Sequence, residues 1–115
     1  KLYALRDVTA TVPSLALIVS SIMSKKIAES LDSLVLDVKL GSGSFQPDKA
    51  KADLLLRELV YVGDQFGIKT TGLISDMDQP LGQMIGNAVE VLESIEVLKG
   101  EGPQAVRELS LELAA

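Results

Sequence analysis

Residues 34–40 read Leu-Val-Leu-Asp-Val-Lys-Leu, and a glycine-rich loop, Gly-Ser-Gly-Ser, follows them at residues 41–44. The run is mostly aliphatic, which is typical of a parallel strand covered on both faces. Glycine tolerates the backbone angles of a tight turn, so we expect the strand to end at this loop. Similar reasoning predicts a second strand over residues 68–75 and a short one over Leu2–Leu5, at the start of the chain.

Helical segments are predicted between and after these strands. The first begins at Pro13 or Ser14 and continues to about residue 29, since proline is favoured in the first turn of a helix. The second covers residues 47–66, where apolar side chains recur every three or four positions. Two more cover residues 87–99 and the segment after Pro103. The predicted order is β-α-β-α-β-α-α, which is typical of the α/β class with a partial parallel sheet.

In a parallel sheet, ligands bind beyond the carboxyl ends of the strands. The segments that leave those ends in the predicted topology are residues 6–11, 39–45 and 75–80. These three segments should therefore lie along one rim of the sheet, where we expect a binding site.

Composition narrows the classes of function. The 115 residues carry a net charge of −5 with no basic block, so nucleic acid is not an expected partner. The chain has no Cys and no His, which excludes a Cys-based metal site and a Ser-His-Asp mechanism within it. No apolar run reaches the ~18 residues of a membrane span. The first residue is Lys1, not Met, so we expect a piece of a longer protein.

Five stretches of the sequence carry a resemblance to a known family. They are Tyr-Ala-Leu-Arg-Asp-Val-Thr-Ala-Thr-Val (3–12), Ser-Ser-Ile-Met-Ser-Lys-Lys (20–26), Asp-Val-Lys with Gly-Ser-Gly (37–43), Asp-Met-Asp-Gln-Pro-Leu-Gly (76–82) and Gly-Asn-Ala-Val-Glu-Val (86–91). In this order, over nearly the whole chain, they resemble the pyrimidine nucleoside phosphorylases, which include thymidine phosphorylase.

The resemblance implies that Arg6, Ser21 and Lys25 bind the pyrimidine. A pyrimidine offers two carbonyl oxygens and an N–H, and these side chains supply donors and one hydroxyl that can also accept. Ser21 and Lys25 are four residues apart, so a helix places them on one face. Arg6 and Lys25 would also act in catalysis, by stabilising negative charge on the departing base. Lys26 lies further round the helix and is expected to be a bystander.

Four further positions match family residues that wall the base pocket. For Val12 and Ile18, ordinary core packing is an equally good interpretation. Ser44 stands where the family often has Ala, so the finer preference of the pocket is open. The implied wall residues are Tyr3, Val12, Ile18 and Phe45.

The resemblance also implies a monovalent-cation (K⁺) site formed by Glu93 and the backbone carbonyls of Leu81 and Met84. The alternative for Glu93 is an exposed helical carboxylate. Mg²⁺ on the strand-end aspartates is not expected, because nucleoside phosphorolysis uses inorganic phosphate and needs no divalent ion. Gly-x-Gly at residues 41–43 is a weak phosphate signal and more often marks a tight turn.

These expectations describe residues 1–115 as the pyrimidine-binding side of the α/β catalytic domain of a nucleoside phosphorylase or phosphoribosyltransferase. The helical domain and the phosphate loop would precede them. The whole enzyme would take a pyrimidine nucleoside and phosphate as substrates, with no organic cofactor, as a cytoplasmic homodimer paired through the helical domain. The alternatives are an anthranilate-phosphoribosyltransferase-like enzyme and a non-catalytic α/β binding module.

Overall fold

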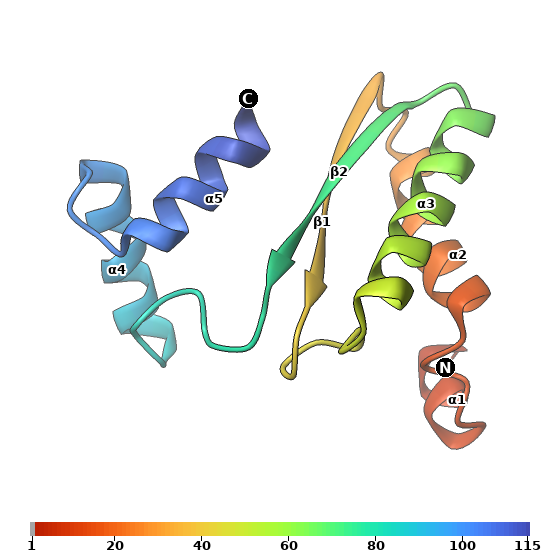
Figure 1. The fold of residues 1–115 in the computed structure, drawn as a ribbon, viewed down its shortest axis with the longest axis horizontal. Coiled ribbons are helices and arrows are strands. Elements are labelled where there is room, and N and C mark those ends of the chain that lie inside the picture. The colour runs from red at the N-terminus through yellow and green to blue at the C-terminus, as the bar shows by residue number, and fades with distance from the viewer. Residues whose placement is uncertain (1) are drawn as a thin grey trace.

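The computed structural model describes residues 2–115, except that the side chains of Leu2 and Tyr3 lie outside the description. Figure 1 shows the path of the chain through its helices and strands. The elements are α1 (Leu2–Val8), α2 (Leu15–Ala28), β1 (Ser33–Leu40), α3 (Lys49–Gln65), β2 (Lys69–Asp76), α4 (Asn87–Lys99) and α5 (Gln104–Ala114).

The predicted strand at Leu2–Leu5 is wrong, because these residues belong to helix α1. The helical turn is continued by hydrogen bonds from the Thr9 amide to the Leu5 carbonyl, at 3.0 Å, and from the Thr11 amide to the Arg6 carbonyl, at 3.0 Å. A short apolar run does not distinguish a buried strand from a helix. The observed order over the described residues is α-α-β-α-β-α-α, with a two-stranded sheet.

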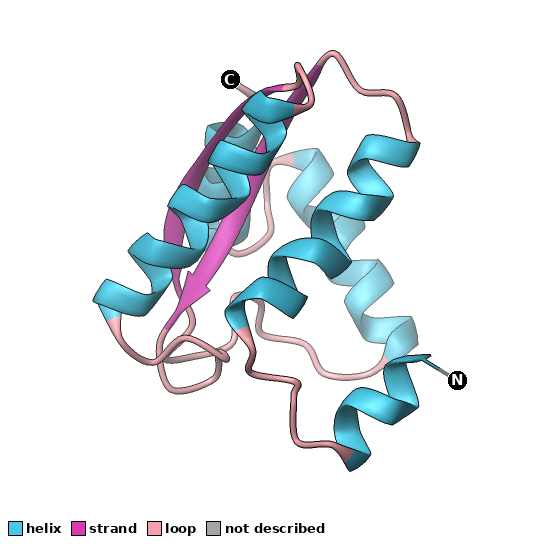
Figure 2. Ribbon diagram, turned by 90° about the vertical axis from the view of Figure 1, so that its right-hand side faces the viewer, coloured by secondary structure: helices cyan, strands magenta, loops and turns pink. Residues whose placement is uncertain are grey.

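The rest of the predicted α/β arrangement is confirmed. Strands β1 and β2 are parallel, with Ser33 paired to Lys69 and Leu40 paired to Asp76. Helix α3 is the crossover between them and begins after Asp48, whose side chain accepts a hydrogen bond from the Ala50 amide at 2.8 Å. Helices α2 and α3 lie on one side of the sheet, and α4 and α5 lie on the other (Figures 1 and 2).

The core lies between α2, α3 and the sheet. Met23 and Leu59 are its most completely buried large side chains, at 1% and 2% exposure. Helix α3 approaches β2 closely at Gly63, where an added Cβ would contact the Thr70 hydroxyl and lie 2.8 Å from the Thr70 Cβ. The core residues are Val19, Met23, Leu34, Val38, Ala52, Leu55, Leu59 and Ile68.

Helix α4 contributes little to this core. Its apolar side chains are largely exposed in the described chain, with Val91 at 59%, Leu92 at 58% and Leu98 at 87%. The buried side chain of α4 is instead a carboxylate, Glu93. Among residues 2–115, no helix combines the length and apolar character that crossing a bilayer requires.

Candidate functional site

A cavity of about 570 Å³ opens beside the carboxyl-terminal half of β1. Its walls come from α1, α2, α3, residues 36–39 of β1 and the loop that follows β1. Most of the lining surface is apolar, as is usual for a small-molecule site with a few polar groups. Five residues of the predicted pyrimidine site line the cavity: Arg6, Val12, Ile18, Ser21 and Phe45.

Arg6 is held at the cavity by the turn between α1 and α2. Its Nη2 donates a hydrogen bond to the carbonyl oxygen of Val12 at 2.9 Å. Its Nε is buried and has no hydrogen-bond partner within the described residues. A buried donor left without an acceptor costs about 1–3 kcal/mol.

Ser21 and Lys25 lie one turn apart on α2. The Nζ of Lys25 donates to the carbonyl oxygen of Ser21 at 2.7 Å and lies 3.3 Å from its Oγ. Ser21 lines the cavity, whereas the exposed Lys25 is not among the lining residues. Lys26 forms an ion pair with Glu29 at 3.1 Å. The structure therefore brings Arg6 and Ser21 to one cavity and places Lys25 just beyond it.

The predicted wall residues differ in their surroundings. Ile18 lines the cavity and also packs against the core. Phe45 is 80% exposed at the cavity wall. Tyr3 belongs to α1, but its side chain lies outside the described part of the chain. Met77 lines the cavity within the predicted rim segment 75–80 but was not named as a site residue, and Gln46 lines it one residue beyond the predicted segment 39–45.

A second hollow, of about 310 Å³, shares Arg6 and Ser21 with the first. It lies between α1 and α2, and its other polar lining residues are hydroxyl side chains. Arg6 and Ser21 therefore stand where the two hollows meet. The hydroxyl residues are Thr9, Thr11, Ser20 and Ser24.

The loop after β1 packs tightly against the loop after β2. The Ser42 amide donates to Oδ1 of Asp78 at 2.7 Å, and the Gly43 amide donates to the Met77 carbonyl at 3.0 Å. Gly41 has a φ of +136°, and a Cβ there would lie 2.7 Å from the Asp78 nitrogen. The hydrogen bond from the Ser42 amide holds the pKa of Asp78 below its usual value of 3.8. These glycines therefore serve a close approach between two loops.

The Ser44 hydroxyl is used within its own loop. It lies 2.9 Å from the carbonyl oxygens of Gly41 and Gln46 and accepts a hydrogen bond from the Gln46 amide at 3.0 Å. The hydroxyl oxygen that Ser44 has and an alanine would lack is thus hydrogen-bonded to the loop backbone.

Glu93 is buried at 9% exposure, so its interpretation as an exposed helical carboxylate is wrong. Its Oε1 accepts hydrogen bonds from the amides of Gln83, at 2.8 Å, and Met84, at 3.3 Å. The carboxylate therefore faces the loop that contains Leu81 and Met84. Within residues 2–115, no group of three or more His, Cys, Asp or Glu side chains is arranged to hold a metal ion.

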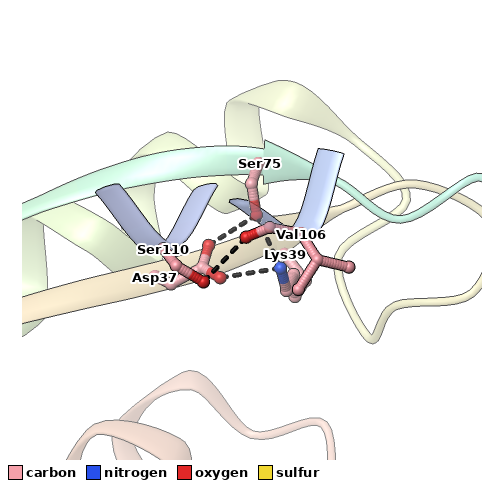
Figure 3. A network of polar contacts seen from close by, with 5 residues as sticks. All are labelled: Asp37, Lys39, Ser75, Val106 and Ser110. Carbon is pink, nitrogen blue, oxygen red and sulfur yellow. Dashed lines mark hydrogen bonds and ion pairs between the residues drawn. The ribbon is translucent and has the colours of Figure 1, made fainter. Parts of the chain in front are cut away.

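Asp37 is occupied by a network that joins the two strands (Figure 3). Its Oδ2 pairs with the Lys39 Nζ at 2.7 Å, and its Oδ1 accepts from the Ser75 hydroxyl at 2.5 Å. Lys39 also donates to the Ser75 Oγ at 2.9 Å. Because both oxygens of Asp37 have partners, the network is structural, and it lies on the side of the sheet where Figure 3 shows Val106 and Ser110 of α5.

The chain is thus an α/β segment with a largely apolar cavity beside a parallel strand, and an arginine and a serine stand at the wall of that cavity. Over all 115 residues the chain is 58% identical to the pyrimidine-nucleoside phosphorylase of Geobacillus stearothermophilus and 55% identical to that of Staphylococcus aureus strain COL. It spans 27% of the length of each of these relatives. No protein-family model matches the sequence. The chain is therefore homologous to a segment of the pyrimidine-nucleoside phosphorylases, which confirms the resemblance.

Proposed function

We propose that this chain forms the pyrimidine-binding side of a pyrimidine-nucleoside phosphorylase. The whole protein would convert a pyrimidine nucleoside and phosphate into the free base and (deoxy)ribose 1-phosphate. The observation that carries the proposal is that Arg6 and Ser21 stand together at the wall of a largely apolar cavity. A pyrimidine offers carbonyl oxygens that can accept from the guanidinium group and polar edges that can bond the hydroxyl.

Each polar residue has a distinct role in this proposal. Arg6 donates a hydrogen bond to a carbonyl oxygen of the base. The Ser21 hydroxyl forms a hydrogen bond with another polar edge of the base. Lys25 brings its ammonium group to the face of α2 that carries Ser21. Cleavage of the bond from sugar to base leaves negative charge on the base, which the two cations stabilise as it develops. Phosphate, the nucleophile, is bound by parts of the enzyme outside this chain.

The resemblance implies a monovalent-cation site, for K⁺, at Glu93 and the backbone carbonyls of Leu81 and Met84. Hard cations prefer oxygen ligands, and this group would supply one buried carboxylate and two carbonyls. Two amide donors hold Oε1 of Glu93, which fixes the carboxylate against the loop. If K⁺ binds here, replacing K⁺ by tetramethylammonium should lower the melting temperature of the wild type but not of Glu93→Gln.

The resemblance alone supports the remaining features of the proposal. The whole protein would be a cytoplasmic homodimer, paired through a helical domain that is not part of these 115 residues.

An exchange chimera tests the proposed function. In it, these 115 residues replace the matching segment of the Geobacillus stearothermophilus relative, to which they are 58% identical. We expect the chimera to phosphorolyse uridine or thymidine. Arg6→Met should lower kcat/KM by about 100-fold or more, as loss of a charge-stabilising donor does.

Arg57→Met is the matched control, since Arg57 is an exposed arginine on α3 outside the cavity. It should leave kcat/KM within about 2-fold of the wild type. A folded chimera without turnover, or equal kinetics for Arg6→Met and the wild type, would overturn the proposed function.

A further inference from the structure

The loop that carries Phe45 is joined to the rest of the fold by two inter-loop hydrogen bonds. They run from the Ser42 amide to Oδ1 of Asp78, at 2.7 Å, and from the Gly43 amide to the Met77 carbonyl, at 3.0 Å. The other hydrogen bonds that the described chain shows for residues 41–46 stay inside this loop. The placement of the loop therefore depends on residues 77 and 78.

Asp78 is itself held in position for this contact. Its amide donates to Oδ1 of Asp76 at 2.9 Å, which forms a turn at the end of β2. The carboxylate of Asp78 then points across to the loop after β1. Of the two inter-loop bonds, this one has an ionised acceptor, and hydrogen bonds to ionised groups are shorter and stronger than neutral ones.

The position of Phe45 is sensitive to this contact. With 80% of its surface exposed, its side chain has little packing to hold it, and the backbone of residues 43–46 determines where it lies. Gly43, Ser44, Phe45 and Gln46 all line the 570 Å³ cavity. A shift of this loop would open one wall of the cavity.

We propose that Asp78 is a positioning residue that holds the loop of residues 43–46 against the cavity and so sets its affinity for the pyrimidine nucleoside. This inference rests on the proposed function, because it assigns the cavity to the base. Asp78 does not contact the base. Its lowered pKa agrees with the geometry, since the Ser42 amide favours the ionised carboxylate.

Kinetics of the exchange chimera test the inference. Asp78→Ala should raise KM for uridine by about 3- to 10-fold, the effect of losing one charge-assisted but exposed hydrogen bond. Both kcat and KM for phosphate should stay within about 2-fold, because the loop lies on the base side. Asp78→Asn keeps an acceptor oxygen and should recover most of the loss. A purely structural role would lower the active fraction, and hence kcat, while leaving KM for uridine unchanged.

The control is Asp53→Ala, which removes an aspartate paired with Lys49 at 2.9 Å on the exposed side of α3. It should leave both KM values unchanged. An active chimera in which Asp78→Ala keeps the wild-type KM for uridine overturns this inference alone. A folded wild-type chimera without turnover overturns the proposed function, and the inference falls with it.

Amide hydrogen exchange in the exchange chimera is a readout that does not depend on activity. The Ser42 amide should exchange about 10-fold faster in Asp78→Ala than in the wild type, while amides of α3 keep their rates. Equal exchange of Ser42 in the two proteins would show that Asp78 does not hold the loop, and would overturn the inference whatever the kinetics.

Discussion

Nζ of Lys25 lies 2.7 Å from the carbonyl oxygen of Ser21, one helical turn earlier on α2. This contact directs the ammonium group toward the face of α2 where Ser21 lines the cavity. The neighbouring Lys26 turns instead to Glu29, at 3.1 Å. Two adjacent lysines of equal length therefore occupy different surroundings.

In the exchange chimera, we expect Lys25→Met to cost on the order of 2–4 kcal/mol in kcat/KM, because it removes a charge that stabilises the departing base. Lys26→Met should cost less than about 1 kcal/mol, since an exposed ion pair contributes little. Steady-state kinetics measures both losses, and melting temperatures exclude unfolding. Equal losses, or a larger loss at Lys26, would contradict the assignment.

The 115 residues alone should show no phosphorolysis. They contain no histidine and no Lys-x-Ser-x-Gly-Gly stretch like the family's phosphate loop. An assay with uridine, thymidine and phosphate checks this, and a blank without protein sets the background. Turnover clearly above that blank would contradict the prediction.

The isolated chain should self-associate. Within the described residues, β1 and β2 pair only with each other, so each strand leaves one edge open. Open edges of apolar strands pair readily with other chains. Sedimentation velocity should show larger species as the concentration rises. A monomer that melts cooperatively at a temperature independent of concentration would be evidence against this expectation.

Gly63→Ala should destabilise the fold by about 1–3 kcal/mol, the usual cost of overpacking a core. The added methyl group would meet Thr70 of β2, with the Thr70 Cβ only 2.8 Å away. Urea denaturation measures the change. Lys51→Ala, at an exposed position on the same helix, should stay within about 0.5 kcal/mol of the wild type. Similar stabilities for the two variants would mean that α3 moves away from β2 without cost.

Asp78 should make stability depend on pH in the acid range. Its folded-state pKa lies below the ordinary value of 3.8, so its contribution is complete above pH 3.8 and is lost as the pH falls through the folded-state value. The wild type should exceed Asp78→Asn in melting temperature from about pH 5 to 7, and the difference should shrink below pH 3.8. A difference that stays constant down to pH 2 would contradict the assignment.

Sequence patterns predicted the fold where the length of a predicted element agreed with the residues that end it. The run at residues 34–40 ends at glycines, and the stripe of α3 spans 17 residues, so neither had a competing interpretation. Leu2–Leu5 was too short to distinguish a strand from a helix. The burial of Glu93 could not be predicted, because it depends on how the backbone of residues 82–84 folds back onto α4.

For the candidate site, the topology argument correctly placed the segments that follow β1 and β2 side by side. It reached Arg6 for the wrong reason, since this residue comes from a helix and not from the end of a strand. The hydrogen bond from Arg6 to the Val12 carbonyl, which fixes the guanidinium, has no signature in the sequence.

The parallel register has a consequence for the order of folding. Ser33 pairs with Lys69, so β1 meets its partner strand only 36 residues further along the chain. At a synthesis rate of about 5–20 residues per second, β1 waits roughly 2–7 s for β2 to be made. Helix α2 precedes β1 and is already made, whereas α3 is made during that interval. The apolar side chains of β1 therefore depend first on α2 and then on α3 for protection, and α4 and α5 on the other side of the sheet (Figure 1) are made only after β2.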